Sequence, residues 1–84
     1  MGEIDLVIQK DGVTHFVEVK TRHSLEFGYP EESITRTKLR HLARTIEMYL
    51  EHAKPSPQKY QADALAITIL PNTEPEFHYV EYIL

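Results

Sequence analysis

Two acidic side chains and a lysine have the types and spacing that suit metal-assisted cleavage of a phosphodiester. The stretch from Gly2 to Thr21, GEIDLVIQKDGVTHFVEVKT, contains Asp5 in its first half and Glu18 with Lys20 in its second. Hard cations such as Mg²⁺ prefer carboxylate oxygens, and a bound divalent metal can generate a nucleophilic water. A lysine beside them can stabilise charge that develops on phosphate oxygens. We therefore take Asp5, Glu18 and Lys20 as candidate catalytic residues, and Asp5 with Glu18 as candidate ligands of Mg²⁺ or Mn²⁺.

A tight hairpin would bring these side chains together. Residues 4–9 are rich in β-branched and aliphatic side chains, residues 13–21 alternate, and Asp11-Gly12 stands between the two runs. Asp-Gly in such a position is a strong signal for a two-residue hairpin loop. The sequence therefore predicts two antiparallel strands, over residues 4–9 and 13–21, with a register set by this turn.

The predicted register places four charged side chains on one face of the sheet. Asp5 lies opposite Glu18, and Glu3 lies opposite Lys20. Side chains two apart on a strand share a face, and directly opposed ones have Cβ atoms roughly 5 Å apart. Glu3 is therefore a candidate supporting residue. The alternative is a solvent-exposed face on which the same four side chains form cross-strand salt bridges, and residue types alone do not separate the two.

Positive charge is concentrated in the middle of a chain whose formal net charge is −4. Six of the nine lysines and arginines lie between residues 20 and 44. This asymmetry favours one positive face for nucleic-acid phosphates on an otherwise acidic body, although a chance run on a solvated helix face gives the same pattern. The candidate nucleic-acid-binding residues are Thr21, Arg22, Arg36, Lys38, Arg40 and Arg44.

One long helix is predicted in the middle of the chain, with Thr35 as its N-cap and Pro55 shortly after its end. Its apolar residues recur at i, i+3, i+4 and i+7 and form a single stripe. Residues 60–70 are then almost continuously apolar, which indicates a central strand buried on both faces. A right-handed crossover through the helix makes this strand parallel to residues 13–21.

Residues 76–84 form the last predicted strand, after a turn at residues 71–75. Three of its aromatic side chains are expected to pack in the core, namely Phe77, Tyr79 and Tyr82. Together the elements predict an α/β fold, a mixed sheet of about four strands with one main helix on a face. A chain of 84 residues is expected to form a single domain, residues 1–84.

Composition excludes several classes of protein. The sequence has no cysteine, so it offers no disulfide framework and no thiolate metal site, which fits a reducing cytoplasm. No stretch approaches the roughly 20 apolar residues of a transmembrane helix, so no membrane partner is expected. The five histidines show no compact ligand spacing, which argues against a zinc site.

The segments GEIDLV, FVEVKTR and FGYPEESIT, followed by a helix, resemble the YraN-like family of uncharacterised proteins. That family is grouped with the PD-(D/E)xK restriction-endonuclease-like superfamily and is related to Holliday junction resolvases. The resemblance implies that Asp5 is the motif aspartate, Glu18 the acidic member of the (D/E)xK element and Lys20 its lysine. It also implies Mg²⁺-dependent nuclease chemistry on duplex or branched DNA, although the superfamily contains members that bind without cutting.

Members of this family usually carry an N-terminal helix and a first strand before GEID, and here the chain starts directly at that motif. We therefore expect an uncovered edge or face of the sheet and, because exposed edges pair with other chains, a homo-oligomer. Asp63 matches an aspartate of the family, and a cap or salt bridge at the sheet margin is its expected role.

Three functions are compatible with the sequence. The first is a Mg²⁺-dependent DNA endonuclease or structure-selective nuclease. The second is a nucleic-acid-binding module of nuclease ancestry without independent catalytic activity. The third is a structural or protein-binding domain whose charged face is a solvated network of salt bridges.

Overall fold

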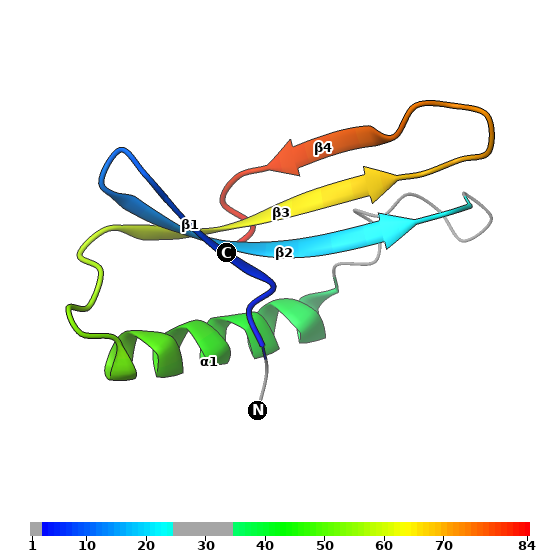
Figure 1. Ribbon diagram of the computed structural model, residues 1–84. Coiled ribbons are helices and arrows are strands. Elements are labelled where there is room, and N and C mark those ends of the chain that lie inside the picture. The colour runs from blue at the N-terminus through cyan, green and yellow to red at the C-terminus, as the bar shows by residue number, and fades with distance from the viewer. Residues whose placement is uncertain (1–2, 25–34) are drawn as a thin grey trace.

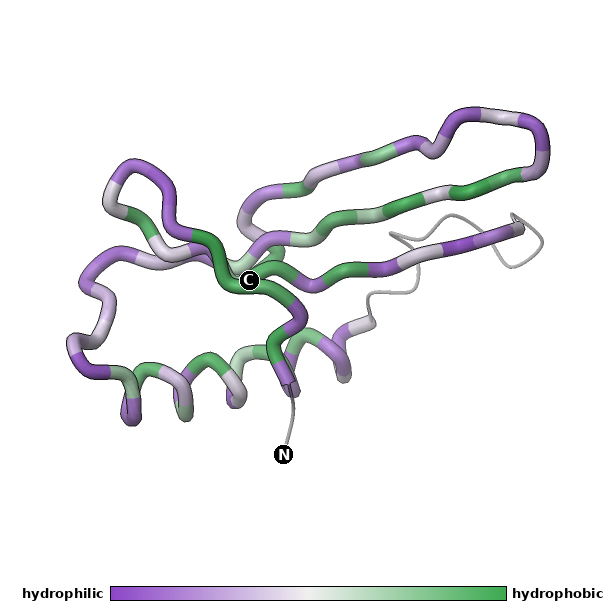
Figure 2. Tube along the Cα trace, in the orientation of Figure 1, coloured by the Kyte–Doolittle hydropathy of each residue, from purple (hydrophilic) through white to green (hydrophobic). Residues whose placement is uncertain are grey.

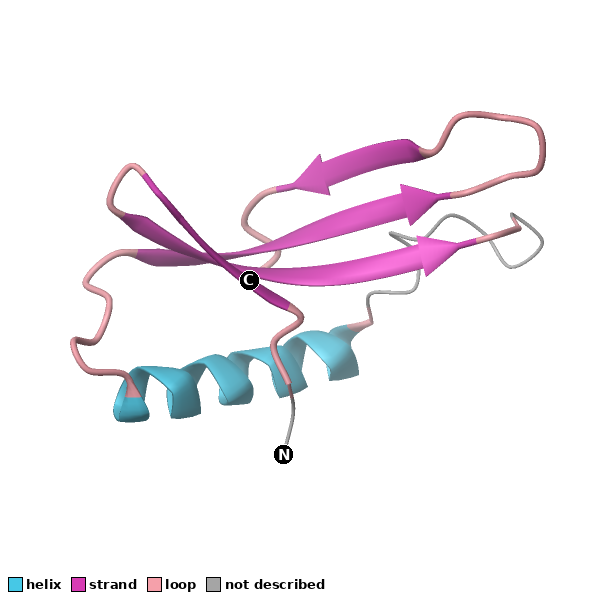
Figure 3. Cartoon of the chain, viewed as in Figure 1, coloured by secondary structure: helices cyan, strands magenta, loops and turns pink. Residues whose placement is uncertain are grey.

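The computed structural model describes residues 3–24 and 35–84, which contain four strands and one helix (Figure 1). The elements are β1 (Leu6–Lys10), β2 (Val13–Arg22), α1 (Arg36–His52), β3 (Tyr60–Thr68) and β4 (Glu76–Val80). The strands form one sheet in the order β1-β2-β3-β4. The β2–β3 pair is parallel and the two outer pairs are antiparallel (Figure 3). The predicted α/β fold, a mixed sheet of four strands with one main helix, is confirmed.

The turn between β1 and β2 has the predicted length and register. Asp11 and Gly12 have φ angles of 51° and 79°, the left-handed values that a two-residue hairpin loop with the twist of the flanking strands requires. Lys10 pairs with Val13, and the ladder runs to the pair of Leu6 with Val17. The strand begins later than predicted, at Leu6 instead of residue 4.

Helix α1 lies along one face of the sheet and supplies half of the core. Thr35 caps it, accepting a hydrogen bond from the backbone N–H of Lys38 at 3.3 Å, as the sequence predicts. The apolar residues of the helix are turned toward the sheet (Figure 2). The buried core cluster consists of Phe16, Leu42, Ile46 and Ala62. Phe16 is completely buried and meets the ring of Tyr49 edge-on, with 5.1 Å between ring centroids.

The opposite face of the sheet is buried at its centre, where Val17 and Asp63 are 0% exposed, and open to solvent toward its edges in the described part of the chain. Leu6 and Ile8 of β1 are exposed on it, and Phe77 of β4 is 68% exposed. The prediction that the C-terminal aromatics pack in the core is therefore wrong for Phe77, and it is also wrong for Tyr82 and Tyr79, which are 68% and 43% exposed. The expectation of an uncovered sheet face is consistent with this exposure.

Three further boundaries differ from the prediction. β2 runs one residue further, to Arg22, while β3 ends at Thr68 and β4 ends at Val80. The motif segment at residues 27–34 lies outside the described residues. In the described part of the chain, no helix has the length and apolar character needed to span a membrane.

Candidate functional site

A groove between the end of β2 and the first half of α1 collects charged side chains. Alternate residues of β2 face the helix, so beyond the buried Phe16 the next two on that face are Glu18 and Lys20. The groove has a volume of about 380 Å³. Its lining residues are Glu3, Glu18, Lys20, Thr37, Lys38, His41, Leu42 and Thr45. The structure therefore brings together three of the four charged residues that the hairpin register predicted to share a face.

Glu18 and Lys20 form an ion pair within this groove. The Lys20 ammonium lies 3.2 Å from Oε1 of Glu18, and the two side chains are 28% and 22% exposed. A lysine this close to a carboxylate offsets its negative charge, because screening by solvent is reduced in a partly buried groove. The pair can therefore present both a negative and a positive group to a ligand in the groove.

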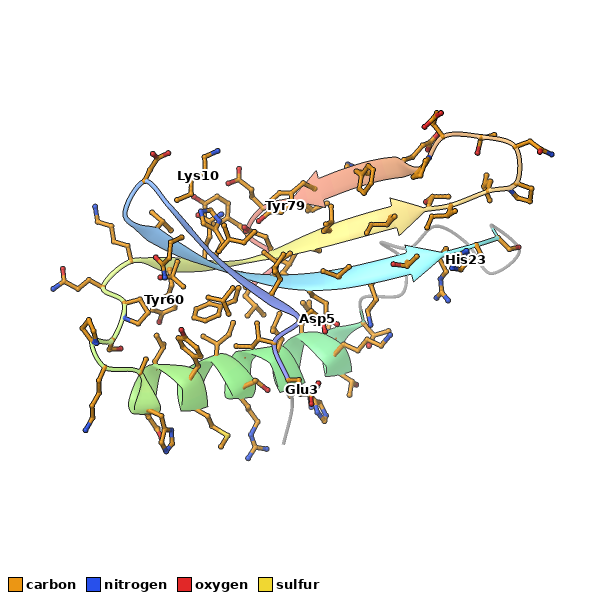
Figure 4. All side chains as sticks on the ribbon, viewed as in Figure 1. Glu3, Asp5, Lys10, His23, Tyr60 and Tyr79 are labelled. Carbon is orange, nitrogen blue, oxygen red and sulfur yellow. The ribbon has the colours of Figure 1, made fainter. Side chains whose placement is uncertain are left out.

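Asp5 lies next to this pair but is held differently from the prediction. Its carboxylate Oδ2 accepts a hydrogen bond from the backbone N–H of Val19 at 2.9 Å. The expectation that Asp5 and Glu3 pair within the strand ladder is wrong, because both precede β1 (Figure 4). Extending the register from Leu6 by one step still puts residue 5 across from Glu18. Asp5 thus contacts β2 beside Glu18, through its side chain.

Glu18 lines the groove and Asp5 lies beside it, and both are carboxylates, the ligand type that hard cations prefer. Among residues 3–24 and 35–84, no group of three or more His, Cys, Asp and Glu side chains is arranged to hold a metal ion. Mg²⁺ is commonly bound by one or two carboxylates together with waters and substrate phosphates. Asp5 and Glu18 match that smaller donor set, and they do not match a site made only of protein ligands.

The candidate nucleic-acid-binding residues separate into two groups. Lys38 lines the groove, and alternation along β2 puts Arg22 on the same face as Lys20 and Thr21 on the other face. The three helix arginines are exposed and are absent from the groove lining: Arg36, Arg40 and Arg44. The sequence predicted one positive face, whereas α1 carries its cations on two sides.

A buried polar cluster around Asp63 forms a second concentration of chemistry, on the sheet face opposite α1. Asp63 is 0% exposed. Its Oδ2 accepts hydrogen bonds from the Tyr79 hydroxyl and from His15 Nδ1, the latter at 2.7 Å. Its Oδ1 accepts from Gln61 Nε2 at 2.8 Å and from the backbone N–H of Tyr82 at 3.1 Å. The contact of Asp63 with His15 has the geometry of the expected salt bridge, but it lies in the interior of β3 and not at the margin of the sheet.

These contacts set the charge of the cluster. Burial alone would raise the pKa of Asp63, but the hydrogen bonds, first that from Tyr79 and then that from His15, hold the pKa below its ordinary value. Burial and the bond to Asp63 raise the pKa of Tyr79. Asp63 is therefore an ionised acceptor at neutral pH, and His15 Nδ1 must be the donor in their contact. A carboxylate in the middle of an almost continuously apolar strand was the sequence signal for this cluster.

Comparison with known proteins finds one family. A model of the uncharacterised protein family UPF0102 matches residues 1–67. A UPF0102 protein of Caldicellulosiruptor saccharolyticus is 43% identical over 67 residues, covering 80% of this chain and 57% of the relative. Another, of Dictyoglomus thermophilum, is 38% identical over 69 residues, covering 82% and 58%. A third, of Leifsonia xyli, is 34% identical over 83 residues, covering 99% and 70%. The chain thus spans little more than half the length of the first two relatives.

Proposed function

This chain belongs to the UPF0102 family, the YraN-like family that its motifs resemble, and we therefore propose that it carries the metal-dependent nuclease site of a protein acting on DNA. The observation that supports the proposal most directly is the Glu18–Lys20 ion pair, which opens into a groove with Asp5 held at the neighbouring residue of β2. Carboxylates and a lysine at one end of a hairpin, beside a helix with cations, are the groups that phosphodiester hydrolysis needs.

Each residue has a distinct role in this proposal. Asp5 and Glu18 would hold the Mg²⁺ or Mn²⁺, which when bound would supply a more acidic water and charge compensation at the phosphate. Lys20 lies 3.2 Å from Glu18 and orients the attacking water or stabilises the charged phosphate oxygens. Glu3 lines the same groove and would support the site as a further carboxylate.

The proposed substrate is duplex or branched DNA. Thr21 and Arg22 follow Lys20 directly on β2, so they extend the site along the strand. Lys38 on α1, which lines the groove, adds attraction for phosphates, a contribution that does not depend on base sequence and that weakens with salt. The chain covers little more than half of the length of its first two relatives. The activity, substrates and partners of the whole protein are therefore proposals as well.

A cleavage assay with matched variants tests the function. The wild-type chain should cut at least one of duplex, single-stranded, flapped and four-way DNA when Mg²⁺ or Mn²⁺ is added, and should stop when the metal is chelated. Asp5→Asn and Lys20→Ala should abolish cleavage while keeping the fold. The controls are Glu47→Gln on the exposed side of α1 and Lys10→Ala at the hairpin turn, which should cut like wild type. Cleavage that survives both Asp5→Asn and Lys20→Ala rules the proposal out.

A nucleic-acid-binding module that does not cut is the second candidate. It is favoured by the small donor set, since no group of three potential ligands is arranged for a metal in the described ranges. This candidate predicts salt-dependent binding to DNA with no turnover in either metal. The same cleavage assay, run beside a binding titration, distinguishes the two functions.

A further inference from the structure

We propose that Lys38 and His41 of α1 form a subsite for one backbone phosphate of the nucleic acid, next to the phosphate that Asp5, Glu18 and Lys20 would act on. The inference rests on the proposed function and deepens it, because it divides the cations of α1 into those that meet the substrate and those that do not. It also adds His41 to the candidate nucleic-acid-binding residues.

The first support is the placement of the side chains around the helix. Lys38, His41 and Thr45 all line the groove that also contains Glu18 and Lys20. At 3.6 residues per turn, these three helix positions fall within about 60° of one another around the axis. The side chains of Lys38 and His41 therefore face the end of β2 across the groove.

The second support is that the arginines lie on a different side. Arg36, Arg40 and Arg44 recur every four residues and are exposed. Their stripe is centred about 130° from the groove-lining stripe around the helix axis. Glu47 and Glu51 continue the arginine stripe, so three positive charges are followed along it by two negative ones, a mixture that suits a solvated surface.

The third support is the balance of charge in the groove. The wall formed by β2 and the N-terminal segment carries Glu3 and Glu18, with Lys20 paired to Glu18. The helix wall carries Lys38 and His41, and neither side chain takes part in an ion pair with any residue in ranges 3–24 and 35–84. Cations in the first half of a helix oppose its dipole, so a bound anion would relieve their repulsion. A phosphodiester, with one negative charge and two free oxygens, matches a lysine and an imidazole side by side.

The groove is held in shape by contacts that do not use these two charged groups. The Thr45 hydroxyl donates to the backbone carbonyl of His41 at 2.9 Å, and the Lys38 backbone N–H is bound by the N-cap Thr35. Leu42, between the two subsite residues and the core, is buried. Changing the Lys38 or His41 side chain should therefore alter binding without unfolding the helix.

The test is a DNA-binding titration at several salt concentrations, with EDTA present so that no divalent metal takes part. The probe is a 20-base-pair duplex, and the variants are Lys38→Gln and His41→Gln. Each should weaken binding several-fold, and Lys38→Gln should lower the slope of log affinity against log salt by about 0.9, the value for one lost phosphate contact. Arg36→Gln and Arg40→Gln are the matched controls on the same helix and should leave the slope unchanged. Circular dichroism should give the same helix content for all four variants.

The outcomes separate this inference from the proposed function. A slope that falls for the arginine variants and not for Lys38→Gln overturns the subsite, and so does equal weakening by all four changes or no binding of the duplex by the wild type. A Lys38-specific effect in a chain that shows no metal-dependent cleavage supports the subsite while removing the nuclease proposal. Cleavage that is normal in Lys38→Gln and His41→Gln at subsaturating DNA would keep the nuclease and overturn the subsite.

Discussion

Replacing Asp63 by asparagine should destabilise the fold by about 2–4 kcal/mol at neutral pH. The carboxylate is fully buried and accepts four hydrogen bonds. Asparagine keeps one oxygen for Gln61 and Tyr82, but its amide N–H groups then face His15 and Tyr79, which both donate. Hydrogen bonds to a charged acceptor contribute about 1.5–3 kcal/mol each, and part of this loss is recovered because the Tyr79 hydroxyl, on a residue 43% exposed, can turn to water.

The measurement is urea unfolding followed by circular dichroism. The midpoint should fall while the slope m stays constant, because the surface exposed on unfolding is unchanged. The control is Glu47→Gln, an exposed carboxylate on α1, which should change stability by less than about 0.5 kcal/mol. An Asp63→Asn chain within about 0.5 kcal/mol of the wild type would falsify the reasoning that the network holds the sheet together.

The difference in stability between the wild type and Asp63→Asn should become smaller in acid. The pKa of Asp63 is lowered in the folded chain relative to its ordinary value of about 3.9. The ionised carboxylate therefore contributes stability above about pH 4, and this contribution disappears as the pH falls through the lowered folded pKa. We expect the gap between wild type and Asp63→Asn to narrow between pH 7 and pH 3. A gap that is constant, or that widens in acid, contradicts the assignment of Asp63 as the ionised acceptor.

Three further predictions follow from the fold. Phe16→Ala should cost about 3–5 kcal/mol in urea unfolding, because the ring is completely buried between the sheet and α1; a loss below about 1 kcal/mol would contradict that burial. Gly12→Ala should cost about 1–2 kcal/mol although space is open around the position, because its φ of 79° is unfavourable for a residue with a Cβ; an unchanged midpoint would argue against the left-handed turn. Self-association remains a prediction, since β1 and β4 are the two edges of the sheet among the described residues and exposed edges pair with other chains; light scattering should give a mass above 9.8 kDa, and a monomeric mass at high concentration would remove it.

The hairpin and its register were predictable because they depend on local chemistry. Asp11-Gly12 allows left-handed backbone at both loop positions, and the loop length then fixes every partner up to Leu6. The start of β1 was not predictable from the same pattern. The Asp5 side chain takes the Val19 N–H, which a continued ladder would give to a backbone carbonyl of the first strand. Asp5, which was expected to lie within the strand, is therefore the residue at which the strand ladder stops.

The partners of Asp63 and the exposed aromatics could not be predicted from the sequence for a different reason. The partners of Asp63 come from β2, β3, β4 and the segment after β4, so no local spacing in the sequence predicts them. Phe77 has a strand-like pattern of neighbours, but its burial depends on whether another element covers that face of the sheet. In both cases the outcome is set by contacts between distant parts of the chain.

Strand β2 also restricts how this chain can change in length. Its even-numbered side chains from Phe16 to Lys20 serve the core and the charged groove, whereas His15 and Val17 on the other side serve the Asp63 cluster and the buried centre of the sheet. Because the two sets alternate, deleting or inserting a single residue between Gly12 and His15 would exchange them, moving the Glu18 and Lys20 groups to the side of the Asp63 cluster and the Phe16 ring away from α1. Viable insertions and deletions in this segment should therefore come in twos.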